Sequence, residues 1–267
     1  MNIVIENCSS PGASFTENTQ FVMWACYDWI IKNPQGLDKF VTFRKTVAKK
    51  YKFNDNNARN IFPLLKNCGF VKYEQGGHIE YDDFFTKEGL AYVKCLDTLK
   101  VYDEIPELKQ ADLIAIEKFR ALITEIVYRG LIRMVKSQAN YSLIFLKCAE
   151  CLLRYEQFSK FEFSYLLYLL DKYPDGNVFS KLDEFISKYR AGELELNVEV
   201  KVRNDTEIRK KSGKEYRNEG IDYLTSFTYF GSLFKQAGLV KITKQGMTSV
   251  SSEKENIEKL VEEYYYG

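Results

Sequence analysis

The stretch IFPLLKNCGFVKYEQGG, from Ile61 to Gly77, is nearly repeated by FGSLFKQAGLVKITKQG, from Phe230 to Gly246. Each copy reads as an amphipathic helix, a glycine that ends it, a short β segment and a turn containing glycine. Because an internal repeat reports on a fold before any single residue does, we expect the same structural unit twice. When Gly69 is aligned with Gly238, the copies share these pairs: Leu64/Leu233, Lys66/Lys235, Val71/Val240, Lys72/Lys241 and Gly77/Gly246.

This order of elements is typical of the end of a winged helix, where a recognition helix is followed by a β-hairpin wing. We therefore predict a mainly α fold with small β-hairpins (α+β), built from two winged-helix (helix-turn-helix) subdomains joined by a helical segment. A chain of 267 residues is long enough for more than one such unit. The expected boundaries are 1–103 for the first subdomain, 104–200 for a helical connecting scaffold, and 201–267 for the second subdomain, which packs with 150–200.

Within the first unit, helical periodicity predicts three helices before Gly69, and the last of them contains the run DNNARNIFPLLKNC. Asn54 or Asp55 is expected to cap this helix. Pro63 has to lie in a first turn or produce a kink, so the helix is expected to begin later than Asp55. Residues 70–73 and 79–81 are expected to pair as a hairpin around Gln75–His78, forming the first wing.

In a helix-turn-helix layout, the N-terminal residues of the recognition helix contact base edges in the major groove. Asparagine pairs with adenine through two hydrogen bonds, and arginine pairs with guanine in the same way. The alternative is that the NDNN run is turn and cap chemistry, whatever the function. The candidate base-reading residues are Asn54, Asn56, Asn57, Arg59 and Asn60.

The formal net charge of +1 hides two basic clusters, each just ahead of one copy of the repeat. Local basic patches are what binding of a polyanion requires, although either cluster alone could be a solvated helix face. His78, the only histidine, is expected on the first wing, near phosphate or solvent. The candidate contacts to the DNA backbone are Arg44, Lys45, Lys49, Lys50, Lys72, His78, Arg209, Lys210, Lys211, Lys214, Lys235, Lys241 and Lys244.

In the second unit, residues 221–237 predict a second recognition-type helix, and 239–242 with 248–250 predict a second wing. Polar residues on the exposed face of that helix are expected to be Tyr223, Ser226, Thr228, Tyr229, Ser232, Lys235 and Gln236. Between the units, apolar periodicity predicts buried helices, and a capping box formed by Ser159 and Glu162 opens one of them.

The alternating run ELELNVEVKV, residues 193–202, predicts a half-buried strand that presents Glu199 and Lys201 on one face. This E-x-K is similar to the metal-binding core of PD-(D/E)xK nucleases, with Asp175 or Asp183 as a candidate upstream acid. Such cores need a surrounding sheet, whereas the preceding residues predict helices. An amphipathic strand with exposed charges is the alternative.

The cysteine pattern and the hydropathy indicate a cytoplasmic protein with reduced thiols. Six cysteines are scattered, the N-terminus lacks the pattern of a signal peptide, and no apolar run reaches the roughly 20 residues of a membrane span. Cys148 and Cys151 form a single CxxC within a helical apolar pattern, which favours buried thiols over a metal site.

The run FEFSYLLYLLDKY…KLDEFISKYR, followed by YFGSLFKQAGLVKITKQG, resembles the DNA-recognition portion of type IIS restriction endonucleases over roughly residues 150–250. The resemblance implies sequence-specific binding of double-stranded DNA at an asymmetric site. Those enzymes carry a separate nuclease domain, for which the chain shows no core. We therefore expect a recognition module that is not itself an enzyme and has no cofactor. Mg²⁺ would enter only with an attached nuclease domain or subunit.

Two alternatives to this function remain open. One is a compact Mg²⁺-dependent nuclease that uses Glu199 and Lys201. The other is a winged-helix docking scaffold, for which an exposed apolar patch is expected.

Overall fold

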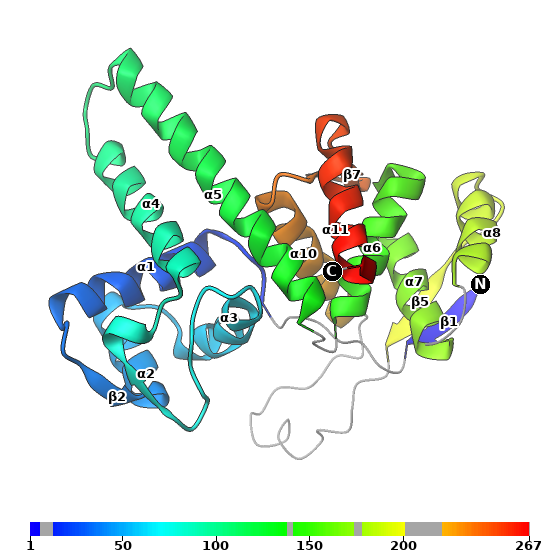
Figure 1. Cartoon of the computed structure of the whole chain (residues 1–267). Helices are drawn as coiled ribbons and strands as arrows, with labels where there is room; N and C mark the ends of the chain where they lie inside the picture. The colour runs from blue at the N-terminus through cyan, green and yellow to red at the C-terminus, as the bar shows by residue number, and fades with distance from the viewer. Residues whose placement is uncertain (6–12, 138–140, 174–177, 201–220, 267) are drawn as a thin grey trace.

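The computed structural model describes residues 1–5, 13–137, 141–173, 178–200 and 221–266, and these are mainly helical with small sheets (Figure 1). The predicted mainly α class is therefore confirmed. The predicted sites Lys201, Arg209, Lys210, Lys211 and Lys214 and the candidate acid Asp175 lie outside the described residues.

The first unit runs helix, strand, helix, helix and strand along the chain. β2 and β3 pair antiparallel, with Leu37 opposite Glu80 and Lys39 opposite His78. A 3₁₀ turn, Tyr81–Asp83, follows β3. The elements are α1 (Glu17–Lys32), β2 (Leu37–Lys39), α2 (Phe40–Tyr51), α3 (Asp55–Asn67) and β3 (His78–Glu80).

The predicted first wing is wrong in its pairing. β3 pairs with β2, and the segment after α3 lies instead beside residues 84–86, where Val71 bridges Phe85. The Tyr81 hydroxyl donates to the Asp38 carboxylate at 2.7 Å, and the Phe40 amide donates to the Gly77 carbonyl at 3.0 Å. These contacts hold β3 against β2, so it is not available to residues 70–73.

The second unit has a similar order, with additional elements between its second and third helices. Its sheet has the order β4-β7-β6, and β6 and β7 form an antiparallel hairpin, so the hairpin predicted after α10 is confirmed. Its first strand comes from the segment that we assigned to the connector. The elements are α6 (Ser142–Tyr155), β4 (Gln157–Phe158), α7 (Lys160–Lys172), α8 (Phe179–Arg190), α10 (Ile221–Gln236), β6 (Val240–Thr243), β7 (Gly246–Ser249), a 3₁₀ turn (Ser251–Glu253) and α11 (Lys254–Tyr266).

The two glycines that align the repeat have the same backbone role. Gly69 has φ +72° and Gly238 has φ +76°, in the left-handed region that ends helices and that glycine adopts at low cost. The predicted glycine stops after α3 and α10 are therefore confirmed.

A third, two-stranded sheet joins the beginning of the chain to the segment after α8. β1 (Asn2–Ile5) and β5 (Asn197–Val200) pair in parallel, with Ile3 opposite Val198. The two strands lie side by side next to α7 and α8 (Figure 1). The predicted strand at 193–202 thus exists, although it begins at Asn197.

Two long helices connect the units. α4 (Lys87–Asp103) and α5 (Gln110–Lys136) run antiparallel and reach away from the rest of the molecule (Figure 1). The C-terminal half of α5 packs on both units. Its Tyr128 hydroxyl donates to the Asn256 carbonyl of α11 at 2.8 Å, and Arg133 lies against the turn after α3.

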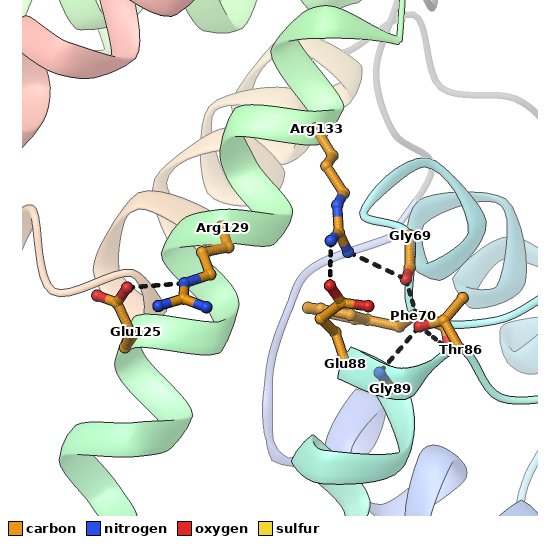
Figure 2. A network of polar contacts seen from close by, with 8 residues as sticks. All are labelled: Gly69, Phe70, Thr86, Glu88, Gly89, Glu125, Arg129 and Arg133. Carbon is orange, nitrogen blue, oxygen red and sulfur yellow. Dashed lines mark hydrogen bonds and ion pairs between the residues drawn. The ribbon is translucent and has the colours of Figure 1, made fainter.

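Arg133 links α5 to the first unit through a small polar network (Figure 2). Its guanidinium pairs with the Glu88 carboxylate at the start of α4 and donates to the Gly69 carbonyl at 3.5 Å. The hydrogen bond from Arg133 lowers the pKa of Glu88, and a bond from the backbone amide of Glu88 contributes to the same shift.

This shift predicts a pH-dependent contribution to stability. Since the folded-state pKa of Glu88 lies below its unfolded value, its contribution is complete above the unfolded pKa and is lost as the pH falls through the folded pKa. We expect Glu88→Gln to lower the free energy of unfolding at neutral pH and to have no effect at a pH where Glu88 is protonated in both states. Urea unfolding of both proteins across acidic pH measures this. A destabilisation that is independent of pH would contradict it.

Candidate nucleic-acid interface

α3 buries one side and exposes polar residues on the other. Its inward residues are Ala58, Ile61, Phe62, Leu64 and Leu65. Because these apolar side chains take the face toward the core, the polar residues between them are left outside. Asn56, Asn57, Arg59 and Asn60 are exposed in the first two turns.

The N-terminus of α3 is capped as the sequence indicates. The Asn54 side-chain oxygen accepts a hydrogen bond from the Asn56 amide at 2.9 Å. Its cap role uses the oxygen that would accept from a base, so Asn54 is less suited to reading adenine than the other three asparagines. The expected late start of this helix is wrong. α3 begins at Asp55 and continues through Pro63, which is exposed.

The exposed polar side chains of α3 are not used by the described part of the fold. There, the side chains of Asn57, Arg59 and Asn60 make no hydrogen bond or ion pair with another residue. The five N–H donors of the Arg59 guanidinium and the side-chain amide groups of Asn57 and Asn60 therefore face solvent. The positive end of the α3 dipole lies at the same end of the helix, which favours an anionic partner there.

The prediction that Arg44 contacts the DNA backbone is wrong, because its side chain is buried. It is only 6% exposed, and its guanidinium donates two hydrogen bonds to the Asp55 carboxylate, at 2.6 Å and 3.1 Å. Its position explains this, because Arg44 follows Phe40 by four residues and therefore shares the buried face of α2 with it. The two hydrogen bonds of the Arg44 guanidinium connect the middle of α2 to Asp55, the first residue of α3.

Removing this ion pair should loosen α3. We expect Arg44→Met to keep much of the packing but to leave the Asp55 carboxylate without its partner, lowering the free energy of unfolding by about 1–3 kcal/mol. The neighbouring, exposed Lys45→Met serves as the matched control and should change stability by about 0.5 kcal/mol or less. Chemical unfolding of both variants measures the difference. Equal effects would show that the pair does not hold the helix.

The lysines of α2 are exposed beside α3. Lys45, Lys49 and Lys50 form no ion pair with another described residue. Lys66, farther along α3, lies 5.4 Å from the centre of the Tyr73 ring. We call the set Lys45, Lys49, Lys50, Asn56, Asn57, Arg59 and Asn60 the α2–α3 surface.

The side of the unit that carries Lys72 and His78 differs in charge. Lys72 and His78 are exposed, but Lys72 is ion-paired with Asp83. The surrounding stretch, residues 74–83, also exposes Glu74, Glu80 and Asp82. Since these carboxylates repel phosphate, we leave Lys72 and His78 out of the candidate interface.

The second unit presents its lysines in a different setting. Lys235, Lys241 and Lys244 are exposed, as predicted. Ser232 of α10 faces the first unit instead, where its hydroxyl accepts a hydrogen bond from the Phe15 amide at 2.8 Å.

α10 and the start of α1 line a cavity of about 560 Å³ that includes Lys235. One face of α10 is thus opposed by another part of the chain, whereas the polar face of α3 is not opposed by any described residue. Nothing is described of the side chains of Tyr223 and Ser226.

The nuclease alternative finds little support among the described residues. Asp183 lies on α8, where it accepts hydrogen bonds from Arg154 and from the Tyr155 hydroxyl at 2.7 Å. The bond from Arg154 lowers the pKa of Asp183. Glu199 lies on β5, which pairs with β1 alone in the described sheets, and its side chain is not described.

The described residues contain no group of three histidine, cysteine or acidic side chains arranged for a metal ion. Cys148 and Cys151 are buried in α6 as free thiols, and burial raises the pKa of both. Neither thiol is therefore set up as a thiolate ligand. None of the described helices is both long and apolar enough to span a membrane.

Comparisons of the chain with protein-family models, curated proteins and solved structures find no match.

Two features of the site were missed from the sequence. The Arg44–Asp55 pair could have been found, because Arg44 falls on the apolar stripe of Phe40, Phe43 and Val47. The closure of one face of α10 by the start of α1 has no local signal, since it depends on how the two units pack.

Proposed function

We propose that this chain binds double-stranded DNA through the α2–α3 surface of its first unit. The observation that carries the proposal is the exposed row of Asn56, Asn57, Arg59 and Asn60, whose side chains the described fold leaves without partners. Asparagine and arginine supply the donor and acceptor pairs that read adenine and guanine edges. The exposed lysines of α2 supply charge for phosphates.

The order of elements supports treating each unit as a winged helix. Apart from α8 and β5, which are additional in the second unit, both units run helix, strand, helix and helix, and the first strand of each pairs antiparallel with the last. In helix-turn-helix proteins, the helix equivalent to α3 enters the major groove. The Arg44–Asp55 pair and the packing of the helix against the core would hold α3 in one orientation, so little order has to be gained on binding.

The finer form of the proposal follows from the resemblance to type IIS restriction endonucleases. The chain would be a cytoplasmic recognition module that reads an asymmetric site, because two units with different exposed surfaces cannot impose a palindrome. Its partner would be a nuclease domain or subunit, which would bring Mg²⁺ with it. Under this proposal the chain alone binds DNA and does not cleave it.

A binding selection from a random duplex library at near-physiological salt, without Mg²⁺, tests the proposal. Enrichment of one asymmetric motif is the expected result. A chain that retains no duplex even at low salt would contradict DNA binding. Retention without enrichment of a motif would contradict sequence reading alone.

Arg59 should contribute specificity. We expect Arg59→Ala to weaken binding to the selected duplex by about 1–3 kcal/mol and to relax the preference at one position of the motif. Titration of the selected duplex and of a scrambled duplex by fluorescence anisotropy separates the two effects. Equal losses on both duplexes would make Arg59 a phosphate contact and would refute base reading by this residue.

Lys49 should contribute affinity without specificity. We expect Lys49→Ala to weaken binding to every duplex to a similar degree and to reduce the salt slope by about one. Lys259→Ala on α11, also exposed, is the matched control for loss of one positive charge. If the two substitutions change the salt slope equally, the effect is one of total charge, and α2 does not contact the DNA.

A further inference from the structure

The turn between α2 and α3 contains a lysine in a backbone conformation that lysine rarely adopts. Lys52, the residue that ends α2, has φ 57° and ψ 41°, in the left-handed region. A side chain is strained there because its Cβ atom approaches the following carbonyl oxygen, whereas glycine has no such atom. Among the described residues other than glycine, Lys52 and Glu156 are the two with a positive φ. Lys52 therefore occupies a position at which glycine would be more stable.

The backbone on both sides imposes this conformation on Lys52. The amides of Lys52 and Phe53 both donate to the Ala48 carbonyl, the second of them at 3.1 Å. The Phe53 ring packs edge-on against Phe21 of α1, with ring centres 6.2 Å apart. Asn54 caps α3 two residues after Lys52, so the chain has to turn within this short segment. The conformation of Lys52 thus follows from the turn and does not depend on its side chain.

Other helix ends with the same conformation use glycine. The φ angle is 72° for Gly69 after α3, 74° for Gly192 after α8 and 76° for Gly238 after α10. A Cβ atom on Gly192 would meet no other atom within 4 Å, so only its backbone conformation favours glycine there. At the end of α2, the same conformation carries a long cationic side chain. The backbone does not explain this lysine, whereas a role for its ammonium group would.

The described fold makes no use of the Lys52 side chain. It is exposed and forms no hydrogen bond or ion pair with another described residue. The carboxylate of Asp55, three residues later, is engaged by Arg44 at 2.6 Å and 3.1 Å. A cation at the end of a helix also interacts favourably with the helix dipole, but Lys49 and Lys50 in the last turn of α2 already supply that interaction.

Lys52 lies where the two halves of the α2–α3 surface meet. It follows the exposed Lys49 and Lys50 of α2 and precedes Asn56, the first exposed polar residue of α3 in that surface. We propose that Lys52 is a further phosphate-contacting residue of this surface, at a position where glycine would raise stability but would remove the contact. This inference rests on the proposed binding of DNA and names one more residue that carries it.

Replacing Lys52 by glycine and by arginine separates the backbone from the charge. Lys52→Gly should raise the midpoint of thermal unfolding by about 1–3 °C, because it removes the strain. The same substitution should weaken binding to a mixed-sequence duplex at low salt by about three- to tenfold and reduce the salt slope by about one. Lys52→Arg keeps both the charge and the strained conformation, so it should leave the midpoint, the affinity and the slope unchanged.

Glu156→Gly is the matched control for the change of backbone. Glu156 ends α6 in the second unit with φ 59°, and its side chain is exposed. Glycine at this position should also raise the midpoint of thermal unfolding, but it should not weaken binding to the duplex. Differential scanning calorimetry and fluorescence anisotropy over a series of salt concentrations measure the two effects on the full chain.

Each remaining outcome contradicts a definite part of this account. If the wild type binds the duplex and Lys52→Gly binds it equally well, the role of Lys52 is refuted and DNA binding stands. A midpoint that does not rise in Lys52→Gly would show that the lysine is not strained and would also overturn the inference. So would a loss of affinity in Glu156→Gly or Lys52→Arg as large as that in Lys52→Gly. A wild-type chain that retains no duplex would overturn both proposals.

Discussion

The close approach of the Phe70 backbone to Gly89 holds α3 against the helices that join the two units. A Cβ atom on Gly89 would lie 1.9 Å from the Phe70 carbonyl oxygen, so no other residue fits without a shift of the backbone. The Thr86 amide donates to the same oxygen at 3.1 Å, and the Phe70 ring stacks on Tyr92 with centres 5.5 Å apart. These contacts hold the C-terminal end of α3 in a fixed position against the start of α4.

The orientation of the proposed interface depends on the contact between Phe70 and Gly89 at one end of α3 and on the Arg44–Asp55 ion pair at the other end. Arg133 of α5 forms an ion pair with Glu88 at the start of α4, and the Arg44–Asp55 ion pair holds the N-terminal end of α3 against α2. Between these two ends only the outer face of α3 is free. A surface held in this way can offer the side chains of Arg59 and the neighbouring asparagines without first ordering a loop, which favours selective binding. The acidic stretch around Lys72 then limits the favourable region for phosphate to the α2 side.

Local features of the structure were predictable from the sequence. Periodicity located the helices, Gly69 and Gly238 marked two helix ends, and the capping box of Ser159 and Glu162 is present, with the Ser159 amide donating to Glu162 at 2.6 Å. The β6–β7 hairpin could be predicted because its two strands are adjacent in the chain and are joined by a tight turn. Each of these features depends on residues within a few positions of one another.

Features that depend on distant contacts were not predictable in this way. β3 pairs with β2, about 40 residues earlier, and β4 pairs with β7, about 90 residues later. Short strands of two or three residues carry no periodicity of their own, so their partners depend on how the helices pack. The acidic residues near Lys72 are present in the sequence. They were not weighed because Lys72 was assigned to a predicted wing that would contact phosphate.

Site-specific photocrosslinking from α3 to DNA tests the central claim most directly. A photoreactive phenylalanine analogue would replace Asn57 in one protein and exposed Glu262 of α11 in a matched control. After irradiation with a mixed-sequence duplex at low salt, the account predicts a covalent adduct from position 57 that disappears as salt is raised, and none from position 262. Equal crosslinking from both positions, or none from position 57 while the duplex is bound, would contradict the assignment of α3 as the helix that faces DNA.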